Sequence, residues 1–166
     1  MQDLDATWAV RTATPADTAR VDALLARSYP KLLRPDYPPS LLVTAVPLIA
    51  RARPELMACG TYFVAVTPAG DVVGAGGYTS KPRREGWYDM RHLVTDDRHL
   101  RRGVARSLVE RIFADLRARG QARLDCLATR TAVPFYLAMG FTALRPVDVP
   151  LSRGLVFPAI QMQRLL

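Results

Sequence analysis

The sequence has few of the residues on which several classes of protein depend. Its two cysteines, Cys59 and Cys126, lie far apart, and neither belongs to a CxxC motif or has a neighbouring histidine. We therefore expect no disulfide and predict two buried thiols in a reducing cytoplasm. The longest apolar run, residues 41–50, contains Thr44 and Pro47. This run is far shorter than the roughly 20 residues of a membrane span. The residues near the N-terminus lack a basic stretch followed by an apolar one, so we expect no secretory signal.

Lysine is also scarce, since Lys31 and Lys81 are the only lysines among 23 basic residues. With 15 acidic residues the net charge is +8, which favours anionic partners such as nucleic acid, a membrane surface or a phosphate-bearing small molecule. Arginine adds a planar group that binds phosphate through two hydrogen bonds. The 166 residues, 49% of them hydrophobic, fit a single domain over residues 1–166.

The pattern of apolar residues, prolines and glycines predicts an α/β fold. The segment Thr14-Pro15-Ala16-Asp17 is typical of a helix start, and we expect that helix to break at Pro30. The remaining elements follow in chain order: a helix near residues 40–53, a hairpin of residues 61–67 and 72–78, a strand at Trp87–Thr95, a helix at 103–119, a strand at Arg123–Ala128, a helix at 131–139 capped by Thr131, and strands at 141–146 and 159–165. This order predicts a mixed sheet flanked by helices.

Three glycines interrupt the second strand of the predicted hairpin. Gly74, Gly76 and Gly77 weaken that strand, because they have no side chain to pack on a sheet. They indicate either a β-bulge or the close approach of another group to the backbone.

The clearest chemical signal is the start of the longest predicted helix. Gly103 would let a ligand approach the backbone there, where unpaired N–H groups carry roughly half a positive charge. Arg101, Arg102 and Arg106 add charge around it. The pattern fits a diphosphate cradle that lacks a P-loop lysine, and it fits equally well a basic helix start that is merely solvated.

Two segments resemble motifs of the GNAT superfamily of N-acetyltransferases. Residues 94–105 (VTDDRHLRRGVA) resemble its acetyl-CoA loop, in which Arg/Gln-x-x-Gly-x-Gly/Ala follows a strand. About thirty residues later, residues 132–141 (AVPFYLAMGF) resemble its A-x-x-F-Y-x-x-x-G-F segment. Either motif alone is weak, but their order and separation are typical of the family. The resemblance covers most of the chain and implies a mixed, mostly antiparallel central sheet flanked by helices, with a diphosphate-binding loop opening the central helix.

The chain departs from that family pattern at two positions. Leu100 replaces the usual Arg or Gln, so one side-chain contact to phosphate is missing. Thr129 replaces the Asn that many members have before the last helix, which removes a contact to the cofactor arm. Backbone amides do most of the phosphate binding in this family, and Arg101 and Arg102 stand beside Leu100.

The resemblance implies acetyl-CoA as co-substrate and no metal. The residues that it assigns to acetyl-CoA are Leu93, Val94, Thr95, Arg101, Arg102, Gly103, Val104, Ala105 and Arg106. The implied activity is transfer of the acetyl group to a primary amine of a small molecule or peptide, by direct attack. No nucleic acid or membrane partner is expected, the location is cytoplasmic, and a homodimer is compatible with the family.

Acetyl transfer requires a neutral amine and a proton for the departing thiolate. The resemblance assigns this general acid to a tyrosine on the last helix, which is Tyr136 here; a core tyrosine is the alternative. On the preceding strand, period-two alternation places Asp89 and Arg91 on one face with residues 93 and 95, and His92 on the other. Family members place the thioester near residues 93–95, so Asp89 is predicted to be the base or to bind a cationic amine. A surface ion pair explains Asp89 as well, and His92 is predicted to be structural.

Substrate recognition is expected from the first two helices and the loops after the hairpin. We assign it to Tyr29, Tyr37 and Arg91, with Met57 and the strand end at Gly76-Gly77 as further lining; ordinary packing is the alternative for each. Two other functions stay open. A CoA-binding regulatory domain without catalysis would account for Leu100, and a small basic nucleic-acid-binding protein would account for the charge but not for residues 132–141.

Overall fold

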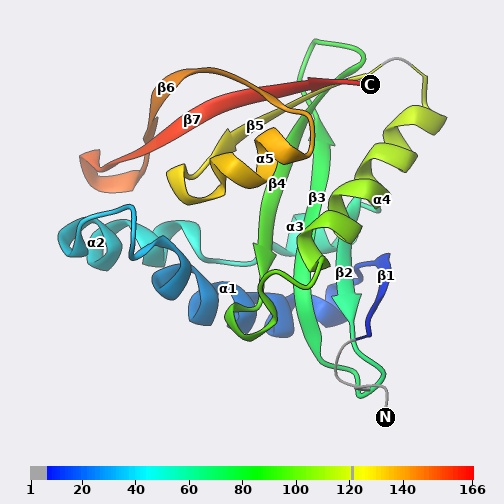
Figure 1. Ribbon diagram of the computed structural model, residues 1–166, viewed down its shortest axis with the longest axis horizontal. Coiled ribbons are helices and arrows are strands. Elements are labelled where there is room, and N and C mark those ends of the chain that lie inside the picture. Colours follow the sequence, from blue (N-terminus) through cyan, green and yellow to red (C-terminus); the bar gives the residue numbers. More distant parts are fainter. Residues whose placement is uncertain (1–6, 121) are drawn as a thin grey trace.

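The computed structural model of this chain describes residues 7–120 and 122–166, and within them one sheet has seven strands in the order β1-β2-β3-β4-β5-β7-β6 (Figure 1). The strands are β1 (Ala9–Thr12), β2 (Tyr62–Val66), β3 (Val72–Ser80), β4 (Trp87–Thr95), β5 (Arg123–Ala128), β6 (Thr142–Pro150) and β7 (Val156–Leu165). The helices are α1 (Thr18–Leu33), α2 (Pro39–Ile49), α3 (Pro54–Ala58), α4 (Val104–Ala118) and α5 (Val133–Ala138). This confirms the predicted α/β class.

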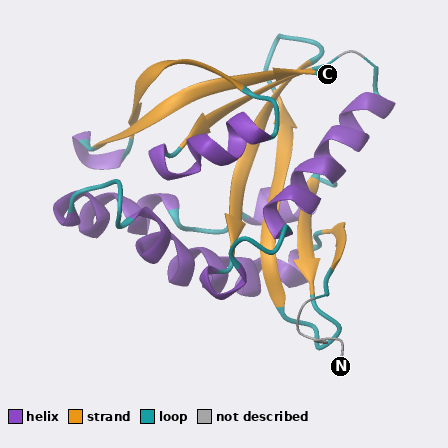
Figure 2. Ribbon diagram, viewed as in Figure 1, coloured by secondary structure: helices purple, strands orange, loops and turns teal. Residues whose placement is uncertain are grey.

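Helices cover both faces of the sheet (Figure 2). On one face, α4 and α5 pack through residues such as Leu108, Ile112 and Tyr136. On the other, α1, α2 and α3 form a second apolar core that includes Leu25 and Val46. Neighbouring strands are antiparallel except β4 and β5, which are parallel. The predicted mixed, mostly antiparallel sheet between helices is therefore confirmed.

Several predicted boundaries are wrong. The short edge strand β1 was not expected, because its four residues carry little pattern. Helix α1 continues through Pro30 to Leu33, since a proline removes only one helical hydrogen bond and buried residues on both sides hold the helix. The helix predicted near residues 40–53 ends at Ile49, and the short helix α3 that follows was not predicted. Thr129, not Thr131, caps the turn before α5, because its hydroxyl accepts from the Ala132 N–H.

The two cysteines differ. Cys126 is buried, as predicted, whereas Cys59 is exposed and lies beside the Thr61 hydroxyl in the turn before β2. The prediction for Cys59 is wrong because that turn lies outside both apolar cores.

Strand β4 is paired differently along its two halves. Residues 87–89 lie between β3 and β5, whereas the described pairing with β5 stops at Asp89 opposite Asp125. Beyond this point β4 and β5 diverge, and residues 90–95 are paired with β3 only. Backbone N–H and C=O groups that face the gap are consequently free of strand partners, a feature that suits a ligand lying along β4.

A β-bulge interrupts the same half of β4. From Ala75 to Gly77 the chain of β3 advances two residues, while β4 advances three, from Val94 to Arg91. The extra residue falls at His92, whose φ of 44° lies in the left-handed region. This bulge lies in β4 and was not predicted. The bulge predicted in the glycine-rich strand is a different one, at the start of β3, where β3 advances two residues from Val72 to Gly74 while β2 advances one. The predicted close approach is present as well, because a side chain at Gly76 would meet Leu93.

Candidate active site

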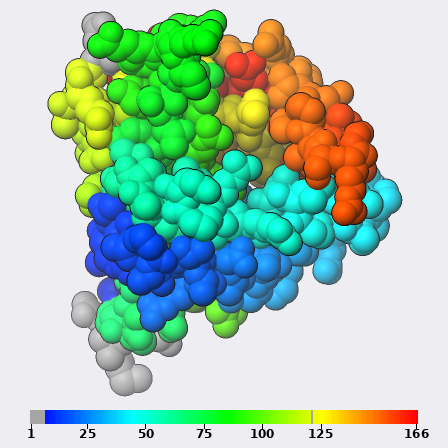
Figure 3. Space-filling model, turned by 180° about the vertical axis from the view of Figure 1, so that it is seen from behind, coloured from blue at the N-terminus to red at the C-terminus, as the bar shows by residue number. Residues whose placement is uncertain are grey.

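The divergence of β4 and β5 opens a cavity of about 520 Å³. Its walls come from β4, β5 and β7, from the ends of α1 and α2, and from α5. On the face seen in Figure 3, the cyan surface of α2 and the orange surface between β6 and β7 lie side by side, consistent with the contacts between α2 and β7. Segments that are distant in sequence therefore enclose this space.

The bulge at His92 decides which side chains face the cavity. Tyr88, Met90 and Leu93 all pack against the core under α4, although regular alternation would place Leu93 opposite the other two. Val94 packs into the core under α1. The prediction that residues 93 and 95 share a face with Asp89 and Arg91 is therefore wrong, because the additional residue reverses the alternation.

His92 lines the cavity together with Asp89 and Arg91. Burial lowers the pKa of its imidazole to about 4, and the neighbouring charges of Arg53 and Arg91 act in the same direction. The ring is neutral at pH 7 and has a nitrogen lone pair available. The prediction that His92 points away from the site is thus wrong, and only the bulge, which no sequence signal announced, brings it in.

Tyr136 projects from α5 into the same cavity. Burial raises the pKa of its hydroxyl well above 10, with further contributions from the nearby Cys126 and Tyr29. Tyr29 comes from α1, and its hydroxyl donates to the carbonyl of Leu93 at 3.5 Å. Tyr136 and Tyr29 are therefore protonated hydroxyls at neutral pH, and both predicted site residues are brought together here.

Asp89 does not stand alone in the cavity wall. The Lys81 ammonium lies 3.1 Å from Asp89 and 2.9 Å from Asp125, which is the neighbour of Asp89 across the parallel pairing. Arg123 donates to the other oxygen of Asp125 at 2.8 Å. Two carboxylates and two cations thus form a compact group without net charge. Lys81, Arg123 and Asp125 were not singled out from the sequence, because only the pairing of β4 with β5, and of β4 with the end of β3, brings them to Asp89.

The two remaining predicted substrate residues have different surroundings. Arg91 lines the cavity, and its Nε donates to the Thr79 hydroxyl at 2.8 Å. Tyr37 lies outside the cavity lining: it stacks on Phe157, donates to the carbonyl of Pro158 and accepts from the Arg130 N–H. Its assignment to the substrate is a misprediction, since these contacts make it a brace between α1 and β7. Met57 is likewise a core residue.

The loop after β4 leads into the start of α4. Gly103 is the N-cap residue with φ of 92°, and its nearest neighbour for an added Cβ is Trp8, 4.0 Å away. The Trp8 indole donates to Ser107 in the first turn of α4, a contact that no motif indicated. Gly103, Arg101 and Arg102 are exposed, so the unpaired N–H groups of the first turn face an open, basic surface. The helix start predicted at Gly103 is confirmed, and its binding of a diphosphate stays a prediction.

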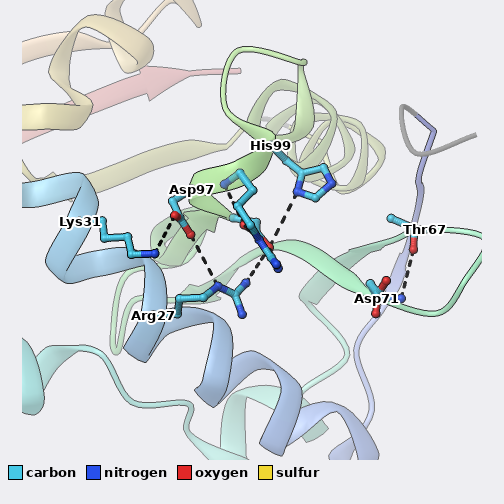
Figure 4. A network of polar contacts seen from close by, with 8 residues as sticks. Arg27, Lys31, Thr67, Asp71, Asp97 and His99 are labelled. Atoms are coloured by element: carbon cyan, nitrogen blue, oxygen red, sulfur yellow. Dashed lines mark hydrogen bonds and ion pairs between the residues drawn. The ribbon is translucent and has the colours of Figure 1, made fainter. Parts of the chain in front are cut away.

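Side chains of α1 hold this loop in place (Figure 4). Asp96 is 1% exposed and accepts from Arg27 at 2.6 Å and from Arg98. Burial alone would raise the pKa of Asp96, but the hydrogen bonds from Arg98 and the charge of Arg27 outweigh it and lower the pKa to about 2. Lys31 pairs with Asp97 at 3.1 Å. The loop is therefore anchored by these ion pairs, together with the backbone hydrogen bond that the Asp96 N–H donates to the carbonyl of Val73 in β3.

A second hollow, of about 740 Å³, lies on the other side of this loop, between α1 and the turn from β2 to β3. It shares no lining residue with the cavity at His92, and its lining includes four arginines and two aspartates. The cavity between β4 and β5 is the better candidate for chemistry, because it alone combines a buried tyrosine, a neutral histidine and free backbone groups.

The described part of the chain has neither a candidate metal site nor a candidate membrane-spanning helix. Residues 7–120 and 122–166 contain no group of three or more His, Cys, Asp or Glu side chains that could hold a metal ion. None of the helices within these ranges is both long and apolar enough to cross a membrane.

Comparison with solved structures shows the same fold in several acetyltransferases. The chain aligns with a GCN5-related N-acetyltransferase of Rhodopseudomonas palustris at 24% identity and a TM-score of 0.77, covering 96% of each chain. It aligns with the PaiA N-acetyltransferase of Thermoplasma acidophilum, solved with coenzyme A, at 10% identity and a TM-score of 0.72, covering 96% of this chain and 99% of that one. It aligns with the GNAT family N-acetyltransferase YhbS of Escherichia coli, solved with CoA, at 23% identity and a TM-score of 0.56. This alignment covers 81% of this chain and 68% of that one.

No curated protein sequence matches this chain. A family model for an acetyltransferase (GNAT) domain, however, matches residues 35–162, which include the loop at Gly103 and the segment around Tyr136. This match spans most of the chain, and the sheet with its single parallel pair agrees with it. The chain belongs to the GNAT family of acetyltransferases.

Proposed function

We propose that this protein transfers an acetyl group from acetyl-CoA to a primary amine of a small molecule or peptide, in the cytoplasm. The observation that carries the proposal is the part of β4, residues 90–95, that is paired with β3 but not with β5. It runs from the cavity wall at Arg91 directly into the loop that ends at Gly103. An elongated ligand along this edge would reach the helix N-terminus with its diphosphate and the cavity with its thioester.

The residues proposed to hold acetyl-CoA fall into two groups. Around the diphosphate, the N–H groups at Val104, Ala105 and Arg106 would donate, and Arg101 and Arg102 would add charge. Along the acyl arm, the backbone of β4 at residues 93–95 would contribute. Val104 acts through its backbone alone, because its side chain is buried against Gly74.

The chemistry proposed is direct attack within the cavity. The amine nitrogen bonds to the thioester carbonyl carbon, and the bond from that carbon to sulfur breaks. The thiolate receives the proton of the Tyr136 hydroxyl, which burial keeps protonated until it is needed. The proton lost by the amine goes to the neutral imidazole of His92.

Asp89 is proposed to bind and orient the acceptor amine. Its carboxylate lies 3.1 Å from Lys81, so proton transfer to Asp89 would work against that ion pair. His92 has no such partner among the described residues, which is why we assign proton acceptance to it. Mutation of His92 and mutation of Asp89 can therefore distinguish proton acceptance from amine binding.

The experiment is a thermal-shift series followed by an amine panel. Acetyl-CoA and CoA should raise the melting temperature and DNA should not, and thiol release from acetyl-CoA should then identify acceptor amines. A shift with DNA alone would contradict the proposal in favour of nucleic-acid binding. A shift with CoA but no thiol release with any amine would contradict it in favour of a regulatory CoA-binding domain.

A further inference from the structure

We infer that the acceptor amine carries a carboxylate on the neighbouring carbon, as an amino acid with an apolar side chain does, and that Arg53 and Arg91 bind that carboxylate. The inference rests on the proposed function and names the substrate class of the same cavity.

The charges of the cavity wall support an anionic ligand group. Lys81 is paired with Asp89 and Asp125. Arg53 and Arg91, in contrast, form no ion pair with any residue in the described ranges, although both line the cavity. With His92 neutral, the cavity therefore has two uncompensated positive charges.

The position of these charges indicates where the anion sits relative to the amine. Both guanidinium groups are close enough to His92 to lower the pKa of its imidazole. Arg91 is oriented by the bond from its Nε to Thr79, which leaves its terminal nitrogens for a ligand. A guanidinium pairs with a carboxylate through two parallel hydrogen bonds. A carboxylate held between them places an adjacent amino group beside His92, the proposed proton acceptor.

The rest of the wall suits an apolar side chain. Residues from α2, the end of β6 and the start of β7 present aliphatic and aromatic groups to the cavity: Leu48, Ile49, Val149, Leu151 and Phe157. A cationic side chain would meet Arg53 and Arg91 with like charge. Leucine and phenylalanine therefore fit the cavity better than lysine or arginine.

The first test compares acceptors that differ only in the anionic group. Thiol release from acetyl-CoA is measured with leucine, leucinamide and isoamylamine, and kcat/KM is expressed per concentration of neutral amine. We expect leucine to exceed both others at least tenfold, which corresponds to about 1.4 kcal/mol. O-phosphoethanolamine tests the other common anion, and a preference for it over leucine would overturn the assignment of a carboxylate.

The second test uses Arg53→Gln and Arg91→Gln. Each should reduce kcat/KM for leucine about tenfold more than for isoamylamine, because only leucine loses a charged partner. Arg51→Gln is the matched control, since Arg51 lies two residues from Arg53 but outside the cavity lining, and it should change neither value. Equal losses for leucine and isoamylamine in both cavity variants would overturn the inference.

A third readout does not depend on turnover. The chain has two histidines, so NMR can follow His92 directly once His99→Gln has assigned the other signal. Binding of N-acetylleucine should raise the pKa of His92, because its carboxylate offsets the charges of Arg53 and Arg91. N-acetylisoamylamine should not. Thiol release with isoamylamine but no preference for leucine would refute this inference alone, whereas no release with any amine would refute the proposed function.

Discussion

The two parts of β4 share the neighbour β3, yet only one of them is paired on both sides. The first half, residues 87–89, is paired on both sides and keeps regular alternation. The second half is paired with β3 alone and contains the bulge at His92. Only the second half lines both the cavity and the approach to Gly103.

This comparison shows how a sheet can provide a binding site without a dedicated loop. Ending the pairing with β5 leaves backbone groups for a ligand, and inserting one residue turns an imidazole into the cavity. The glycines opposite make room, because Leu93 occupies the space above Gly76. Four predictions test this comparison, and those with the greater expected change come first.

Tyr136→Phe should reduce the rate of acetyl transfer roughly 10²-fold or more while leaving acetyl-CoA affinity unchanged, since it removes only a proton donor. Single-turnover thiol release measures the rate, and calorimetry measures the affinity. Tyr88→Phe is the matched control, because Tyr88 packs under α4 outside the cavity. A wild-type rate in Tyr136→Phe would mean that water is the acid.

Gly103→Glu should abolish stabilisation by acetyl-CoA, through steric block and repulsion of the diphosphate. At a hundredfold excess over Kd the wild-type protein should gain about 2.7 kcal/mol. Gly120→Glu introduces the same charge at another glycine with positive φ, at the far end of α4, and should retain that gain. An unchanged melting temperature of the wild type in millimolar acetyl-CoA would contradict the cradle itself.

Asp96→Asn should lower the free energy of unfolding by about 2 kcal/mol at pH 7, because the loop after β4 is anchored by this carboxylate. The folded pKa lies below the unfolded value, so this stability is present above about pH 4 and is lost as the pH falls towards 2. Urea unfolding at pH 7 and at pH 3 should show the difference shrinking. Asp97→Asn, whose partners are more exposed, should lose less than about 1 kcal/mol.

His92→Gln should reduce kcat/KM about tenfold, and Asp89→Asn should raise KM more than it lowers kcat. Because the pKa of His92 is about 4, the imidazole is neutral above about pH 5, so the rise of kcat/KM with pH should follow the pKa of the acceptor amine. The measurement is kcat and KM of the wild type and both variants with one amine from pH 6 to 9. A larger loss of kcat in Asp89→Asn than in His92→Gln would return the role of base to Asp89.

Much of the fold was predictable because its signals are local. The apolar stripe of α4, the turn between β2 and β3, and Gly103 before a basic helix each lie within one stretch of sequence. The same is true of Tyr136, whose segment ends in Gly140. These residues determine their own backbone conformation, so a single sequence suffices to place them.

The composition of the cavity was decided by tertiary structure. Asp89 was predicted as a base or an amine-binding residue beside Arg91, but the parallel pairing brings Asp125 to it and Lys81, from the loop after β3, pairs with both carboxylates. Tyr37 was predicted at the substrate, but stacking on Phe157 places it elsewhere. Such contacts join residues far apart in the chain, and no periodicity along one strand contains them.

By itself, then, the sequence determined the α/β class, the helix start at Gly103 and the tyrosine on α5, because each depends on residues near in the chain. The tertiary structure alone decided that β4 leaves β5 after Asp89 and that His92 joins Arg91 in the cavity wall. The physical reason is that one additional residue in a paired strand reverses every later side chain, and that residue is recognisable only against its partner strand.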